Sequence, residues 1–137
     1  MAAELRGGCQ CGGVRYEVMG APQQLVVCHC TDCQRQSGSA FGMTLVVKEE
    51  DFRITKGEVK TYLSTSDAGR AKLGAFCPGC GTRIYHKPEW RKGMVSVKPG
   101  TLDDTGGLMP DIHIWTASKQ PWITIPEEVE QHDKSPS

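Results

Sequence analysis

Seven cysteines fall in three short clusters, and their spacing constrains the fold of this 137-residue chain more than any other feature. The clusters are Cys9-x-Cys11, Cys28-x-Cys30-x-x-Cys33 and Cys77-x-x-Cys80. Structural zinc sites are tetrahedral with four protein ligands, whereas catalytic sites commonly have three and leave one position for water or substrate. The two pairs can therefore close one structural site, and the middle triplet can form a second site with an open position.

The cysteines could also form disulfides, a redox pair or a second structural site. An odd cysteine count fits a disulfide framework poorly, and the absence of an apolar signal stretch favours a reducing cytoplasmic location, where disulfides rarely persist. The Cys77-x-x-Cys80 pair could be a redox dithiol, although no βαβ pattern surrounds it. The triplet could also be structural, if His29, another side chain or an oligomer partner closed it.

The charge balance indicates the class of partner. Sixteen basic and sixteen acidic residues give a formal net charge of zero, and binding of two Zn²⁺ by seven ionised thiols would make the chain negative. Such a chain lacks the basic footprint of a nucleic-acid binder. No run is apolar and long enough to span a bilayer. We therefore expect a small-molecule partner, with no nucleic acid and no membrane.

Short alternating runs of apolar residues predict a mainly β fold with antiparallel sheets. These runs are Val14, Tyr16 and Val18; Phe41, Met43 and Leu45; Phe52 and Ile54; Val95 and Val97; and Ile112 and Ile114. Glycine- and proline-containing turns separate them at close intervals. We expect a single domain over residues 1–126, followed by a loose tail over 127–137, because the tail has little apolar content.

One short helix is predicted after Cys30. Thr31 is a suitable N-cap and Gly38 a suitable C′ residue, which gives about two turns. The partial positive charge of the helix N-terminus favours thiolates at Cys30 and Cys33. Cys28 points to the same side of the extended chain as Cys30. Three thiolates with a free fourth position could bind an incoming thiol as thiolate, which is a means of thiol activation.

Several motifs in order resemble the glutathione-dependent formaldehyde-activating enzyme family, which also includes centromere protein V. The resemblance runs from about Leu5 to Ile125 and rests on five motifs: Gly8-Cys9-x-Cys11-Gly12-x-Val14-Arg15-Tyr16; Cys28-His29-Cys30-x-x-Cys33-Gln34-x-x-Ser37-Gly38-Ser39-Ala40-Phe41; Phe76-Cys77-x-x-Cys80-Gly81-Thr82; Gly100-Thr101-Leu102-Asp103; and His113-Ile114-Trp115-x-x-Ser118-Lys119-x-x-Trp122.

The resemblance implies an Mss4-like β-sandwich with zinc knuckles and two Zn²⁺ per chain. It implies a structural zinc on Cys9, Cys11, Cys77 and Cys80, and a catalytic zinc on Cys28, Cys30 and Cys33. The implied activity is that of a carbon–sulfur lyase, which condenses formaldehyde with glutathione to S-(hydroxymethyl)glutathione. Glutathione or a related thiol and a small aldehyde are then the expected partners. The alternative function is a non-catalytic, zinc-stabilised binding module of the same fold.

Other residues carry weaker expectations. Arg35 and Lys119 are candidates to bind the carboxylates of glutathione. The Ser37-Gly38-Ser39 segment either offers donors near the open zinc position or simply ends the helix. His113 is expected to be a hydrogen-bonded core histidine rather than a proton carrier. Trp115 and Trp122 are expected to fill the space between sheets, and Trp90 to line a loop over the cleft.

Overall fold

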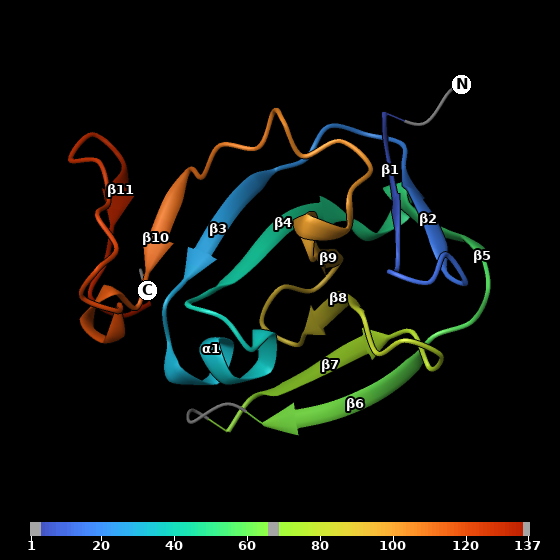
Figure 1. Ribbon diagram of the computed structural model, residues 1–137, viewed down its shortest axis with the longest axis horizontal. Coiled ribbons are helices and arrows are strands. Elements are labelled where there is room, and N and C mark those ends of the chain that lie inside the picture. Colours follow the sequence, from blue (N-terminus) through green and yellow to red (C-terminus); the bar gives the residue numbers. More distant parts are fainter. Residues whose placement is uncertain (1–3, 66–68, 136–137) are drawn as a thin grey trace.

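The computed structural model describes residues 4–65 and 69–135, which form eleven strands, one α-helix and three short 3-10 helices (Figure 1). The strands are β1 (Leu5–Gly8), β2 (Arg15–Val18), β3 (Gln24–Cys28), β4 (Gly42–Lys48), β5 (Phe52–Lys56), β6 (Lys60–Thr65), β7 (Ala71–Phe76), β8 (Arg83–Pro88), β9 (Met94–Val97), β10 (Ile112–Ile114) and β11 (Glu130–Gln131). The helices are α1 (Thr31–Ser37), η1 (Glu49–Asp51), η2 (Pro99–Thr101) and η3 (Thr116–Ser118). This architecture confirms the mainly β fold with one short helix.

Two sheets build the domain. Strands β1, β2 and β5 form a small antiparallel sheet, and the other strands form a large sheet in the order β11-β10-β3-β4-β9-β8-β7-β6. The sheets are antiparallel as expected except at one edge, where β10 runs parallel to both β3 and β11. The reason is topological, because the long connection after β9 crosses to the far side of β3 before the chain enters β10.

The main core lies between the two sheets. It gathers side chains of β2, β3, β4, β8 and β9, among them Tyr16, Leu25, Val47, Ile84 and Val97. Side chains of neighbouring residues alternate across a strand, so the second face of the large sheet carries a smaller cluster of Val26, Val46 and Ile112. Two of the cysteines, Cys9 and Cys77, are part of the main core.

Helix α1 follows β3 and has the predicted length and C-terminal end. Gly38 has a left-handed backbone (φ 66°) and its N–H donates to the Gln34 carbonyl, as a glycine at this position favours. The N-cap prediction is wrong, because the cap is Cys30 and Thr31 is the first helical residue. The Cys30 sulfur accepts a hydrogen bond from the Cys33 N–H at 3.2 Å, in the place that a hydroxyl oxygen usually takes at a helix N-cap.

The segment predicted to be a loose tail is hydrogen-bonded to the domain over part of its length. Residues 130–131 form β11 beside β10, and the N–H groups of Trp115, Thr116 and Ala117 donate to carbonyls of residues 132–134. Apolar content was a poor guide here, because backbone groups on the open edge of β10 can be satisfied by any chain that lies alongside. Residues 136–137 lie outside the described part.

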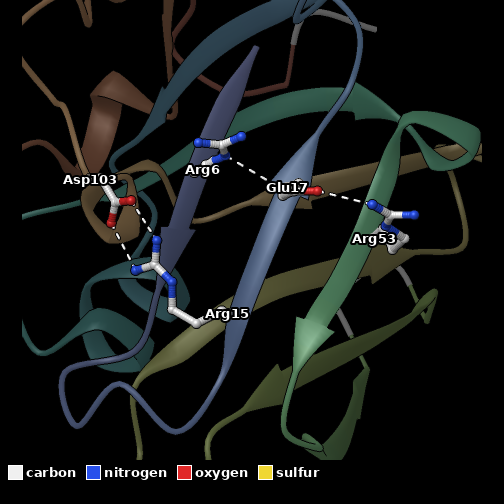
Figure 2. Close-up of polar contacts among 5 residues, drawn as sticks. All are labelled: Arg6, Arg15, Glu17, Arg53 and Asp103. Carbon is white, nitrogen blue, oxygen red and sulfur yellow. Dashed lines mark hydrogen bonds and ion pairs between the residues drawn. The ribbon is translucent and has the colours of Figure 1, made fainter. Parts of the chain in front are cut away.

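Ion pairs tie the outer face of the small sheet to its surroundings (Figure 2). Glu17 on β2 pairs with Arg6 on β1 at 3.2 Å and with Arg53 on β5 at 3.0 Å. Arg15 makes a two-pronged contact with Asp103, with one N–O distance of 2.8 Å. These arginines lower the pKa of both carboxyl groups. The pairs are exposed, so each contributes little to the free energy of folding. Their role is to favour one register and orientation of the strands.

Candidate metal centres and the adjoining cavity

Four cysteines meet where the small sheet adjoins the large one. Cys9 and Cys11 lie between β1 and β2, and Cys77 and Cys80 lie in the turn between β7 and β8. Their sulfur atoms all lie within 4.8 Å of one another, with Cys9–Cys11 at 3.6 Å and Cys11–Cys77 at 3.8 Å. A tetrahedral zinc site with Zn–S bonds of about 2.3 Å has sulfurs about 3.8 Å apart, so this four-cysteine cluster fits a metal ion.

Backbone N–H groups surround the sulfurs of the four-cysteine cluster. Val14 N–H donates to Cys9 at 3.2 Å, Gly13 N–H to Cys11 at 3.4 Å and Gly79 N–H to Cys77 at 3.3 Å. Such donors stabilise thiolates and orient them toward a metal. Gly81 adopts φ 80°, and this left-handed backbone returns the chain from the turn into β8.

The remaining three cysteines form a second group, here called the triplet. Cys28 ends β3, Cys30 caps α1 and Cys33 lies in the first helical turn. Their sulfurs lie within 4.8 Å of one another, and all three residues are half-buried. Within residues 4–65 and 69–135, no fourth cysteine, histidine or carboxylate joins the group. The triplet can therefore hold a metal ion and leave one position open.

His29 does not close the triplet. Its side chain is fully buried, and Nε2 lies 2.9 Å from Nδ1 of His113, which is itself 9% exposed. Burial lowers the pKa of both imidazoles. His113 is thus a hydrogen-bonded core histidine, as expected.

The electrostatics of the triplet favour a bound cation. Without one, hydrogen bonds from Cys28 and Cys33 hold the Cys30 thiolate and lower its pKa to about 2, whereas the same contacts strongly raise the pKa of Cys28. Three adjacent thiolates repel one another, so each ionised sulfur opposes ionisation of the other two. A divalent cation removes this repulsion and allows all three thiols to ionise.

Gly42 gives the triplet room on its sheet side. Gly42 lies opposite Cys28 in the β3–β4 register. A Cβ at this position would lie 3.1 Å from Cβ of Cys33, 3.5 Å from its Sγ and 3.6 Å from Nζ of Lys98. Glycine therefore keeps open a space that Cys33 and Lys98 both face.

A cavity of about 470 Å³ lies between α1 and the ends of β8 and β9. It is lined by Gln36 and Ser37 of α1, by Arg83 and Lys98 at the ends of β8 and β9, and by neighbouring residues of the turns. None of the three cysteines lines it, but Lys98 lies on its wall and also on the Cys33 side of Gly42. Lys98 is thus the residue that links this cavity to the triplet, and the cavity is large enough for a small molecule.

Comparison with known proteins identifies the family. Residues 4–118 match the family described as "Glutathione-dependent formaldehyde-activating enzyme", and this range includes all seven cysteines. The chain belongs to this family.

Two curated relatives carry the description "Putative glutathione-dependent formaldehyde-activating enzyme". One, from Colletotrichum graminicola, is 27% identical over 115 residues, which cover 80% of this chain and 59% of the relative. The other, from Halomonas elongata, is 24% identical over 127 residues, which cover 88% of this chain and 80% of the relative. A crystal structure of a Rhodobacter sphaeroides protein has the same fold, with a TM-score of 0.58 and 21% identity over 77% of this chain and 91% of that one.

The secondary candidates in this formaldehyde-activating enzyme family member are exposed or already engaged in hydrogen bonds. Arg35 is exposed, and Nζ of Lys119 donates to the Ile123 carbonyl at 2.7 Å. The Ser37 hydroxyl donates to the Phe41 carbonyl at 2.9 Å, which fits the helix-ending role. Trp122 is 71% exposed, so the expectation that it fills the space between sheets is wrong.

The other two tryptophans also depart from simple core packing. Trp115 is half-buried and adopts a left-handed backbone (φ 57°) at the start of η3. Trp90 is 38% exposed, and its ring lies under the guanidinium of Arg70 at 4.9 Å. Neither ring lines the cavity.

Sequence reasoning missed a cationic group beside the cavity. It consists of Lys72, Arg83 and Lys98, with the buried His86 between them in the sheet. Arg83 donates through Nη1 to Nε2 of His86 at 3.0 Å. Burial is the main cause that lowers the pKa of His86 to about 2, and the three cations add to it. The imidazole is therefore neutral and acts as an acceptor.

A pH dependence of stability follows from His86. The unfolded chain takes up a proton here below about pH 6.5, whereas the native chain does not, so stability is lost as the pH falls through that value. When the pH falls from 7.5 to 5.5, we expect the free energy of unfolding to decrease by about 1 kcal/mol more in the wild type than in His86→Gln. Urea unfolding at the two pH values measures this difference, and equal losses would show that folding does not lower the pKa of His86.

Proposed function

We propose that this chain is a zinc-dependent, carbon–sulfur lyase-like enzyme. It would activate glutathione or a related thiol for addition to, or release from, a small carbonyl compound such as formaldehyde. The observation that carries the proposal is the triplet, in which three converging sulfurs leave one coordination position without a ligand from the described residues. Family membership supports the same chemistry.

The two cysteine groups would have different roles. Cys9, Cys11, Cys77 and Cys80 would hold a structural zinc, because four sulfurs complete its coordination and two of them are part of the core. Cys28, Cys30 and Cys33 would hold a catalytic zinc. A zinc ion there would supply a position at which the substrate sulfur is held as thiolate at neutral pH.

The residues around the triplet would prepare the reactants. The first turn of α1 positions Cys30 and Cys33 through the bond from the Cys33 N–H to the Cys30 sulfur. Gly42 leaves space on the sheet side, and the adjoining cavity would admit the rest of the thiol. Sulfur would then form a bond to the carbonyl carbon, the π electron pair would move to oxygen, and the proton released when the thiol became a thiolate would be returned through water to complete the hydroxyl. No oxidant or reductant is needed, and the reverse reaction breaks the same C–S bond.

Calorimetry on the zinc-loaded protein tests this proposal. Glutathione is expected to bind to protein that contains two zinc ions per chain, and S-methylglutathione at least tenfold more weakly, because its thioether cannot become a thiolate ligand. Equal binding of both would show that the sulfur is not recognised. Binding of neither would exclude glutathione and favour the alternative, a non-catalytic zinc-stabilised binding module.

A further inference from the structure

The face of the large sheet that carries Val26 and Val46 also carries polar residues near the triplet. Residues directly opposite each other in paired strands share a face. Cys28 is opposite Gly42, Ser96 is opposite His86, and His86 is opposite Gly74. Lys98 lies two residues after Ser96 and so extends this face beyond the end of β9.

Both Arg83 and Lys98 lie where glycine makes room for them. A Cβ on Gly74 would lie 2.3 Å from Nη1 of Arg83, so the guanidinium rests directly against the backbone of β7. The bond to His86 holds Nη1 and leaves the other guanidinium donors available. Nζ of Lys98 faces the same space beside Gly42 as the Cys33 sulfur.

These two cations have no acidic partner among the residues that the structure describes. Lys72, their neighbour, pairs with Asp32 of α1 at 3.3 Å, but no carboxylate lies within ion-pair distance of Arg83 or Lys98. Both line the cavity beside the triplet. Partly buried cations without a carboxylate partner, on the wall of a cavity, are suited to an anionic ligand.

We propose that Lys98 and Arg83 bind a carboxylate of the thiol substrate, so that the site selects anionic thiols over neutral thiols of the same length. This inference rests on the proposed function, since the substrate sulfur is taken to bind at the triplet. The planar guanidinium of Arg83 suits a carboxylate through paired donors, and Lys98 supplies a second charge nearer the sulfur. In this proposal Lys98 and Arg83, and not Arg35 and Lys119 as the sequence suggested, bind the substrate carboxylate.

A matched pair of thiols tests the proposal on zinc-loaded protein. We would measure binding of 3-mercaptopropionate and of 3-mercaptopropanamide by calorimetry, to the wild type and to Lys98→Met, with Lys92→Met as an exposed-lysine control. Lys98→Met is expected to weaken binding of the acid roughly ten- to hundredfold and to change binding of the amide less than about twofold. Lys92→Met should change neither.

The outcomes separate the carboxylate site from the thiol site. Equal weakening of acid and amide, or no weakening of either, would overturn the carboxylate site while leaving the triplet as a thiol site. If neither thiol bound to wild-type protein with two zinc ions, the carboxylate site would be overturned, and the glutathione calorimetry above would decide the thiol site separately. Zinc content and thermal unfolding would show that each variant is folded, and Arg83→Gln, expected to show the same selective loss, provides the test if Lys98→Met does not fold.

Discussion

Replacement of Cys77 by serine is expected to unfold the domain or to leave it only marginally folded. Cys77 lies in the main core and in the four-cysteine cluster, which joins the β1–β2 connection to the β7–β8 turn. Zinc bound by such a site contributes roughly 10–16 kcal/mol of apparent free energy, so loss of even a third of it removes about 3–5 kcal/mol. That loss is comparable to the whole stability of a small domain, which is about 5–15 kcal/mol.

Zinc content and thermal unfolding by circular dichroism measure the effect of Cys77→Ser. The variant should retain at most one zinc ion per chain and should lose its cooperative transition or show it at a much lower temperature. A variant that keeps two zinc ions and unfolds within a few degrees of the wild type would show that the four-cysteine cluster is not a structural metal site.

Replacement of Cys30 by serine is expected to leave the fold intact and to abolish thiol binding. Serine is a good N-cap, so its hydroxyl can accept the Cys33 N–H in place of the sulfur, and the cost in stability should be below about 1 kcal/mol. With only two thiolates left, the site should lose its zinc at low metal concentration. Glutathione affinity should then fall at least about a hundredfold, since the substrate sulfur loses its partner.

The matched measurements on Cys30→Ser are zinc content, thermal unfolding and glutathione calorimetry. One zinc ion per chain with a wild-type transition and no glutathione binding is the expected combination. Global unfolding of this variant would show that the triplet is structural. Retained binding of glutathione would place the thiol somewhere else on the protein.

The contrast between the two variants depends on a grouping of cysteines that the sequence could predict. Short spacings within each cluster restrict which sulfurs can converge, and tetrahedral coordination leaves few partitions of seven. The end of α1 was predictable for a similar local reason, because Gly38 can adopt a left-handed backbone without strain. The identity of the N-cap was not predictable from the sequence. N-cap propensities favour residues with a hydroxyl, such as Thr31, and do not include a cysteine sulfur such as that of Cys30.

Features that depend on strand register were beyond the sequence. Arg83 and Lys98 are fifteen positions apart in the chain, and only the pairing of β7, β8 and β9 places both on one cavity wall. The parallel pairing of β10 with β3 and β11 could not be predicted either. Parallel strands require a crossover connection, and short-range sequence patterns do not show where such a connection leads. Trp122 was misplaced because large aromatic residues usually lie in the core, whereas this one lies on the surface.

The position of the four-cysteine cluster also sets an order of events during synthesis. Cys11 and Cys77 are separated by 66 positions, so the N-terminal pair leaves the ribosome long before the pair that completes its site. Until the β7–β8 turn has emerged, Cys9 and Cys11 can offer a metal only two thiolates. A metal bound by these four cysteines would therefore join the small sheet to the large one only after β7 has been made.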